Sequence, residues 1–276
     1  MRSKKFSLRE KHLASPYALW SVIFVVAPMF FVLYYSFTSA EGAFTFANIL
    51  ALGKYKEVFL RSIWLGLAAT AICLVLAYPI AYAVAHMTEN VQRTMIMLVM
   101  LPMWMSFLIR TYAWMTLLQD TGIINSFLGR FGIEPIHMIN TQGAVILGMV
   151  YNYLPFMILP LYSVMAKMDG SLLEAAHDLG ANGLSVLRKV ILPLSLPGIA
   201  TGITMVFVPC VSTFYISQKL GGGSFDMVGD TIERQFREAN NYNLGAALSL
   251  VLMVLILLSM AFMRRFTDDD EEAGIL

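Results

Sequence analysis

The residues best placed for specific chemistry lie in one charged segment near the middle of the sequence, between two long apolar runs. Its fixed points are Glu174, Ala175, Ala176, Asp178, Gly180, Leu192 and Pro193. No catalytic motif occurs in this segment, so the chemistry that it offers is recognition. A carboxylate such as Glu174 can cap its own helix or pair with a cation on another protein, and the sequence leaves both roles open.

Two short helices must position these residues. Ser171 and Glu174 have the spacing of a capping box, which predicts a helix that starts at Ser171. Gly180 falls where this helix should end in a left-handed turn. A second short helix is expected from about Ser185 to Pro193. The neighbouring His177 is expected to be a surface contact, because no cysteine or second histidine lies near it.

Nothing in the sequence predicts an enzyme. A Walker A loop, an H-E-x-x-H motif and a G-x-S-x-G motif are all absent. The two cysteines, Cys73 and Cys210, lie inside apolar runs, where a thiol behaves as a small hydrophobic group. The histidines lie in tails or near loops without the spacing of metal ligands. We therefore expect no catalytic residues, no metal and no cofactor.

The composition is that of a membrane protein that crosses the bilayer several times. Hydrophobic residues make up 58% of the chain, charged residues make up 13%, and the mean hydropathy is +0.68. A net charge of +1 gives no reason to expect nucleic acid as a partner. We expect membrane lipid to surround the protein.

Apolar runs of about 20 residues, the length that crosses the hydrocarbon layer as a helix, mark the predicted spans. Because these runs are continuously apolar and do not alternate, helices are favoured over barrel strands. Arg110 interrupts the third run, and its long side chain is expected to reach the outer interface or to pair with an acid. The runs cover residues 17–37, 62–85, 94–112, 143–164, 197–216 and 244–263.

Basic residues favour an orientation with both termini in the cytoplasm. This predicts a cytoplasmic tail at 1–16, a six-helix domain at 17–263 with a cytoplasmic loop at 167–196, and an acidic cytoplasmic tail at 264–276. The outer connections are expected to hold a connector at 38–61, a short helix within 119–142 and an amphipathic interfacial helix within 226–239.

The central segment resembles the EAA loop of ABC importer permeases. That pattern is E-A-A, three residues, G, nine residues, then I-x-L-P, and this sequence departs from it only in having Val190 for isoleucine. The resemblance implies a type I ABC importer permease fold with all-α architecture. It also implies that the loop is a coupling helix, through which ATPase subunits move the spans.

The resemblance extends over nearly the whole chain from the first span onward. Residues 108–114, 154–163 and 173–181 are similar to the B-type membrane subunit of spermidine/putrescine importers. This implies a bacterial cell-membrane subunit that forms half of a path for polyamines. It further implies a homologous second permease, two ATP-binding subunits that hold the ATP, and an external substrate-binding protein.

A path for polyamines must handle several positive charges, yet no predicted span has an acid in its interior. Aromatic faces can stabilise a passing cation, each contact being worth about 0.5–2 kcal/mol. They can equally serve as interface belts. The candidates for the path are Trp104, Tyr112, Trp114, Tyr151, Tyr153, Phe214 and Tyr215. Outer acids could guide the cation and dock the binding protein, namely Asp120, Asp226, Asp230 and Glu233.

Other functions remain open on the sequence alone. A permease of the same class could carry iron, thiamine, sulfate or another small solute. A secondary transporter normally needs ionisable groups inside the membrane or inverted repeats, and neither is evident here. A membrane-embedded enzyme would need a polar constellation inside the spans, and none is found.

Overall fold

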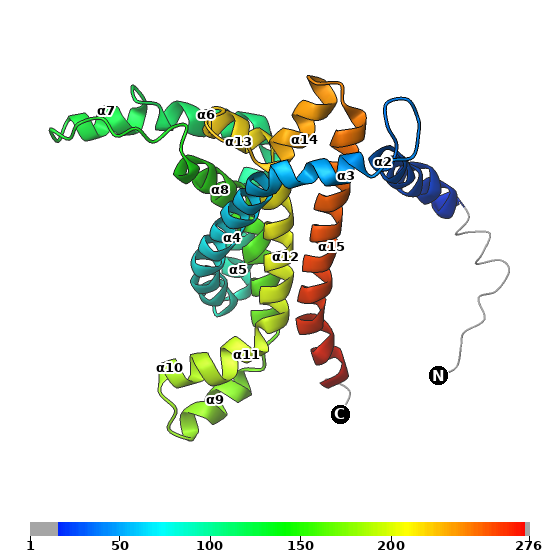
Figure 1. Cartoon of the computed structure of the whole chain (residues 1–276). Helices are drawn as coiled ribbons and strands as arrows, with labels where there is room; N and C mark the ends of the chain where they lie inside the picture. Colours follow the sequence, from blue (N-terminus) through cyan, green and yellow to red (C-terminus); the bar gives the residue numbers. More distant parts are fainter. Residues whose placement is uncertain (1–15, 274–276) are drawn as a thin grey trace, which may run out of the picture. The chain divides into compact units, whose positions relative to one another are not determined.

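The computed structural model describes residues 16–273, so the predicted N-terminal tail at 1–16 lies almost wholly outside the described residues. Over this range the regular elements are helices, as predicted, and the one strand-like pairing is an isolated bridge between Thr38 and Phe44. Four short segments labelled η are π-helical (η1, η4) or 3₁₀-helical (η2, η3), and those labelled α are α-helices. In chain order, and as drawn in Figure 1, the elements are η1 Val22–Val26, α2 Ala27–Ser36, α3 Ala47–Ala51, η2 Leu52–Tyr55, α4 Lys56–Ala85, α5 Glu89–Met100, η3 Leu101–Trp104, α6 Phe107–Leu118, α7 Ile123–Gly129, α8 Gln142–Met165, α9 Gly170–Asp178, α10 Gly183–Val186, η4 Leu187–Ile191, α11 Leu192–Leu194, α12 Leu196–Ser212, α13 Tyr215–Leu220, α14 Val228–Arg237 and α15 Tyr242–Ala273.

Four helices in the described range are long and apolar enough to cross a membrane, and two bent helix pairs raise the number to as many as six. The continuous ones are Pro16–Ser36, Ala47–Ala85, Gln142–Met165 and Tyr242–Arg264. They correspond to the predicted first, second, fourth and sixth spans. The third and fifth predicted spans correspond to the bent pairs.

The chain divides into two compact units. Among the described residues, the first unit joins 16–56 with Ile232–Met253. Within it, the amide of Asn243 donates to the carbonyl of Thr38 over 2.7 Å, and Asn48 donates to the same carbonyl over 2.9 Å.

The prediction of a connector over the whole of 38–61 is wrong in its extent, because the chain is already helical from Ala47. Charged residues there end the apolar run without ending the helix.

The second unit, Glu57–Thr231 with the residues from Val254 onward, contains the predicted third span as a broken helix. Segments Glu89–Trp104 and Phe107–Gly129 meet at an angle of 86°. The break follows Pro102 and lies at Met105 and Ser106, whose ψ angles of 146° and 129° are not helical. A single straight span at 94–112 is therefore wrong, because these non-helical residues interrupt the helical hydrogen bonds there. The short helix predicted within 119–142 is confirmed as α7.

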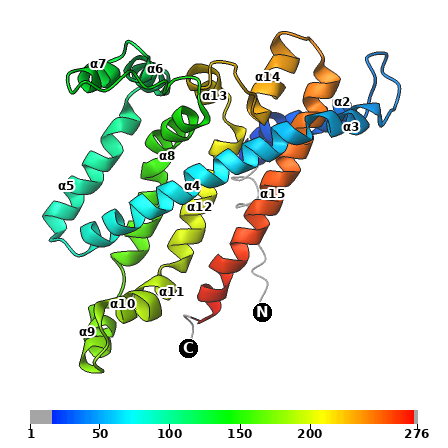
Figure 2. The same ribbon diagram turned by 60° about the vertical axis from the view of Figure 1, so that its left-hand side comes forward.

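Helices α8 and α12 form the core of the second unit and lie side by side in Figures 1 and 2. Two glycines of α12 allow this approach. A Cβ atom at Gly198 would lie 3.0 Å from the carbonyl oxygen of Pro160, and one at Gly202 would lie 2.6 Å from the sulfur of Met157. Small residues thus bring the two backbones together, as they do in other membrane helix pairs.

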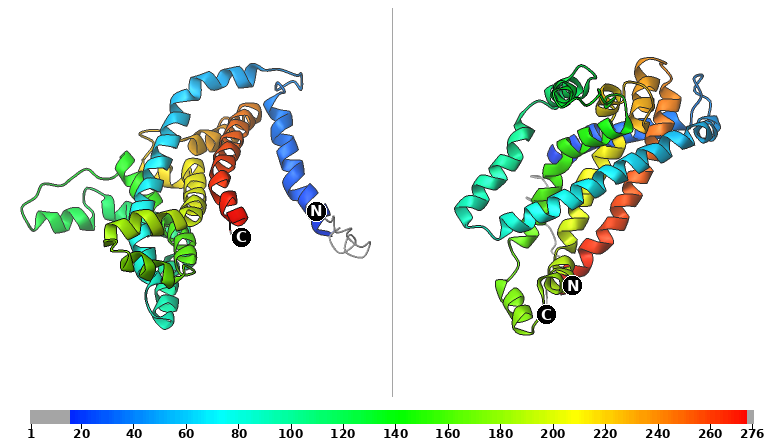
Figure 3. Two further views of the ribbon diagram at one scale, coloured as in Figure 1. Left: turned by 90° about the horizontal axis from the view of Figure 1, so that it is seen from below. Right: turned by 90° about the vertical axis from the view of Figure 1, so that its left-hand side faces the viewer.

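Within this unit, α6, α7 and α13 lie at one end of the α8–α12 pair, and α9 and α10 project beyond the other end (Figures 1 and 2). The right-hand view of Figure 3 shows the same separation, with the green α6–α7 segment at the top and the yellow-green α9–α10 segment at the bottom. The two predicted functional regions therefore occupy opposite ends of one unit.

The last predicted elements are helical as well. The amphipathic helix expected within 226–239 is confirmed as α14. The final helix, α15, continues to Ala273, so the backbone of the predicted acidic tail is helical as far as that residue.

Candidate functional site

Helix α9 of the central segment is capped by a different residue from the one predicted. It starts at Gly170, and the side chain of Asp169 accepts a 2.9 Å hydrogen bond from the backbone N–H of Ser171. The predicted capping box of Ser171 and Glu174 is therefore wrong, since the side chain of Asp169 caps the helix and the helix begins one residue earlier than predicted. Glu174 is exposed and has no capping hydrogen bond in the described part of the chain.

The cap predicts a pH effect at α9. The donors of Ser171, chiefly its backbone N–H, lower the pKa of the Asp169 carboxyl below its usual range. The stabilisation of α9 by this carboxylate is then fully present above the ordinary carboxyl pKa and is lost as the pH falls through the lowered pKa. Asp169→Ala should speed amide exchange in residues 170–173 at neutral pH, while Asp169→Asn should retain slow exchange. Equal exchange in all three proteins would contradict this capping role.

Gly180 ends α9 as predicted, with a φ angle of 78°. The N–H of Ala181 donates to the carbonyl of Ala176 over 3.1 Å, which is the long hydrogen bond of a Schellman motif. This left-handed turn reverses the chain. The side chain of Asn182 then accepts a 2.9 Å hydrogen bond from the N–H of Ser185, so the second helix starts at Gly183, slightly before the predicted Ser185.

The second short helix is joined to the spans at Ser195. Segments Gly183–Leu194 and Leu196–Ser212 meet there at 65°. The hydroxyl of Ser195 is buried, donates to the carbonyl of Leu192 and lies 3.0 Å from the hydroxyl of Tyr78 on α4. Movement of the hairpin can therefore reach both α12 and α4 through one buried hydrogen-bonded residue.

The hairpin presents an apolar surface that the described residues 16–273 leave exposed. Leu172 is 46% exposed, Leu179 is 88% exposed and Leu184 is 56% exposed. Exposed side chains also include Glu174, Ala175, Asp178, Leu192 and Pro193, whereas Ala176 is half-buried. Leucines projecting at the end of a unit, with acids beside them, have the composition of a docking surface for another protein.

At the other end of the unit, four of the predicted path residues gather where α12 breaks and α13 begins. A cavity of 370 Å³ opens there, lined by Tyr153, Phe214 and Tyr215 together with Phe107, Leu108, Pro209, Ser212 and Thr213. Tyr112 adjoins it, with its ring centroid 6.3 Å from that of Tyr215. The break leaves Thr213 extended.

The remaining aromatic candidates do not line this cavity. Trp114 packs against Tyr151 at 5.4 Å in an edge-to-face pair. Trp104 ends η3 and is 75% exposed. The structure thus separates the seven predicted residues into a cavity group, a packed pair and an exposed tryptophan.

A lysine that the prediction omitted lies beside the cavity group. The Nζ of Lys219 is 5.5 Å from the ring centroid of Tyr112 and 5.8 Å from that of Tyr215. Lys219 follows Tyr215 by four residues, so both share one face of α13. That spacing was visible in the sequence and could have indicated the pairing.

Arg110 is a buried residue of α6. It is 8% exposed, and its guanidinium lies 6.0 Å from the ring of Phe107. Its Nε and Nη1 atoms have no hydrogen-bond partner in the described chain. Arg110 lies on the inward face of α6 and has no acid partner among the described residues. Its reach to the outer interface stays a prediction.

The four outer acids have different surroundings. Asp120 pairs with His137 at 3.0 Å, and Glu233 pairs with Arg237 at 3.0 Å. Asp226 is half-buried. Asp230 is 4% exposed, so its predicted role as a surface docking acid is wrong.

The carboxylate of Asp230 is instead part of a buried network. It accepts hydrogen bonds from the hydroxyl of Ser217 over 2.9 Å and from the N–H of Met227 over 2.8 Å. The adjacent N–H of Val228 donates to the hydroxyl of Ser62 over 2.7 Å. These bonds connect the start of α14 to α13 and α4. The bond from the N–H of Met227 is the one that an acid at the third helical position accepts in a capping box.

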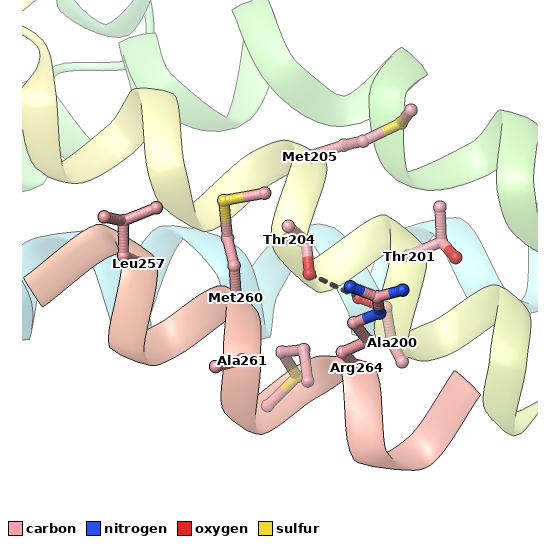
Figure 4. Close-up of a pocket in the computed structure, with 9 residues that line it drawn as sticks. Ala200, Thr201, Thr204, Met205, Leu257, Met260, Ala261 and Arg264 are labelled. Carbon is pink, nitrogen blue, oxygen red and sulfur yellow. Dashed lines mark hydrogen bonds between the residues drawn. The ribbon is translucent and has the colours of Figure 1, made fainter. Parts of the chain in front are cut away.

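A second opening lies along α12 and residues 257–264 of α15, with a volume of 660 Å³ (Figure 4). Thr204 does not present a free hydroxyl to it, because that group donates to the carbonyl of Ala200 over 2.9 Å. The hydroxyl of Thr201 likewise donates to the carbonyl of Pro197 over 2.8 Å, and the rest of the lining is alanine, methionine and leucine with Arg264. A groove with a cation and no carboxylate is a poor site for a polycation. No group of three or more metal-ligating residues occurs among the described residues.

Comparison with known proteins matches residues 90–268 to the family described as "Binding-protein-dependent transport system inner membrane component". The chain is 39% identical over 249 residues to the spermidine/putrescine transport system permease protein PotB of Haemophilus influenzae, covering 87% of each chain. It is 38% identical over 247 residues to PotB of Escherichia coli, covering 86% of this chain and 90% of that one.

Among solved structures, the fold is similar to a chain of a bacterial alginate ABC transporter that was crystallised with its alginate pentasaccharide-bound periplasmic protein. The TM-score is 0.74 over 93% of this chain and 94% of that chain, with 18% sequence identity. At this identity the likeness concerns the fold alone.

Proposed function

Because the chain belongs to the family of binding-protein-dependent transport system inner membrane components, we propose that it is the permease subunit of an ATP-driven importer of polyamines. The observation that carries this proposal is the 39% identity to a spermidine/putrescine permease across 87% of both chains. A likeness of this length covers most of the chain and is not confined to one motif.

The proposed role is non-catalytic. ATP is bound and hydrolysed by two partner subunits, and the hairpin at 167–196 receives their motion. The exposed leucines Leu172 and Leu179 support this role, because they form an uncovered apolar surface beside Glu174. With its capping role excluded, Glu174 is free to pair with a cation of the partner. We assign the coupling role to Glu174, Ala175, Ala176, Asp178, Gly180, Leu192 and Pro193.

The remaining partners are a homologous second permease, with which this chain encloses the path, and an external substrate-binding protein. The chain is a multi-pass inner-membrane protein, and we place both of its termini in the cytoplasm. The α6–α13 end of the second unit then faces outward. Asp120, Asp226 and Glu233 are the acids proposed to dock the binding protein.

The path through this subunit is proposed to pass the aromatic cavity at the end of α12. Its aromatic rings supply negative faces for a cation, and its apolar walls suit the methylene segments of a polyamine. High affinity belongs to the external binding protein, since no acid lines this cavity.

The test is ATP-dependent uptake by the complete complex reconstituted in proteoliposomes. Radiolabelled spermidine should accumulate only with ATP, the binding protein and both permeases present, and putrescine should compete with it. If neither polyamine is transported while another solute of the same importer class is, the cargo assignment is wrong and only the importer class stands.

A further inference from the structure

The two tyrosines beside the aromatic cavity already hold a positive charge. Tyr112 on α6 and Tyr215 on α13 lie almost edge to face, with ring centroids 6.3 Å apart and an interplanar angle of 83°. The ammonium group of Lys219 lies within 5.8 Å of both ring centroids. Two rings directed at one ammonium group form a cation site, and here the occupant is a side chain of the same protein.

This site communicates with the cavity through Tyr215. The ring of Tyr215 lies 5.9 Å from that of Phe107, and both residues line the 370 Å³ cavity. Its lining contains no acid and no lysine. A flexible chain with an ammonium group at its end can therefore place the ammonium at the tyrosine pair and its methylene groups against the apolar lining.

Two cations cannot share this site. A second ammonium group at the tyrosine pair would lie within a few ångströms of Lys219, and like charges at that separation repel in a partly buried setting. The exchange of one ammonium for another leaves the local charge unchanged. Lys219 is half-buried and Tyr112 is 44% exposed, so the lysine has room to swing away.

We propose that Tyr112 and Tyr215 form a site for an alkylammonium group, that Lys219 occupies it when no cargo is present, and that the arriving cargo displaces Lys219. This inference rests on the proposed function for the identity of the cargo, spermidine or putrescine. Lys219 then acts as an internal competitor: it keeps the site closed to single small cations and yields to a polycation delivered at high local concentration.

The displacement can be measured without transport. Lysines of the purified complex are reductively dimethylated with ¹³C-formaldehyde, which preserves their positive charge, and the signal of Lys219 is assigned by its absence in Lys219→Arg. In the wild-type complex this signal should be shifted upfield by the two rings and should return to the position of a solvated lysine as spermidine is added. A signal that spermidine does not move overturns the proposal, whether or not the complex transports polyamines.

Uptake kinetics give the second test. Lys219→Met removes the competitor and should lower the KM for spermidine about fivefold, the effect of about two weak cation–π contacts. Lys219→Arg keeps a cation and should leave the KM near the wild-type value. Lys54→Met removes an exposed charge elsewhere and serves as the matched control.

Variants of Tyr112 give a third test, again by the KM for spermidine. Tyr112→Leu removes one ring and should raise the KM, Tyr112→Phe should not, and Lys219→Met should have no further effect in the Tyr112→Leu background. An unchanged or higher KM in Lys219→Met, with the Lys54→Met control unchanged, overturns the displacement while leaving the proposed importer function intact. A wild-type complex that imports no polyamine is evidence against the proposed function. The spermidine titration then still decides whether spermidine displaces Lys219 from the tyrosine pair.

Discussion

Replacing Gly180 with proline is expected to abolish ATP-dependent uptake, by at least about 100-fold, while the chain still inserts into the membrane. Gly180 has a φ angle of 78°, whereas proline fixes φ near −65°. The substitution therefore breaks the turn that reverses the chain between α9 and α10, together with the Ala181–Ala176 hydrogen bond. The ATPase subunits that we propose to bind here would then meet a misdirected hairpin.

The matched control is Gly180→Asn, because asparagine enters the left-handed region readily. It should retain most of the uptake. A Cβ atom at position 180 would meet nothing within 4 Å, so crowding among the described residues of this chain is not the source of any defect. Membrane insertion is checked by the amount of full-length protein in washed membranes. Normal uptake in Gly180→Pro would remove the coupling role of this turn.

Glu174→Lys tests the same surface by charge instead of backbone geometry. Since Asp169 caps the helix, this substitution should leave α9 folded and should weaken co-purification of the ATPase subunits along with uptake. Glu89→Lys reverses an exposed acid on another predicted cytoplasmic segment and serves as the control. If both glutamate variants transport like the wild type, Glu174 does not pair with the ATPase.

The second large effect is expected at Asp230, where Asp230→Ala should destabilise the protein by about 3 kcal/mol. The substitution leaves the buried N–H of Met227 without an acceptor and removes the bond that the hydroxyl of Ser217 makes to a charged group, although this hydroxyl can still donate to the carbonyl of Phe214 over 2.9 Å. A hydrogen bond to a charged group contributes about 1.5–3 kcal/mol. Each unpaired buried group costs about 1–3 kcal/mol. For a chain of this size such a loss lowers the Tm by roughly 6–12 °C.

Thermal unfolding of the detergent-solubilised subunit measures this effect. Glu238→Ala removes an exposed acid just beyond the end of α14 and should leave the Tm unchanged. Asp230→Asn can still accept one hydrogen bond and should fall between the two. A Tm of Asp230→Ala equal to that of Glu238→Ala would mean that the network does not hold α14 in place, and would return Asp230 to the set of possible docking acids.

Some of the candidate site was predictable because it depends on local chain geometry. The end of α9 at Gly180 follows from the conformations that glycine permits, and the structure confirms it. The start of α9 was placed wrongly because Asp169, Ser171 and Glu174 all offer helix-capping groups, and the choice among them depends on small differences in free energy. The break at Met105 was missed because hydropathy reports how long and how apolar a segment is, and does not report whether its helix bends.

The sequence by itself determined that this is an all-α membrane protein and that its central hairpin carries the recognition motif, because span length and capping residues act over a few neighbouring positions. The tertiary structure alone decided which polar groups meet. It buried Asp230 with Ser217, and it placed Tyr112 over Lys219. These partners lie on separate helices, and their proximity follows from how whole helices pack. No pattern within a single helix records that packing.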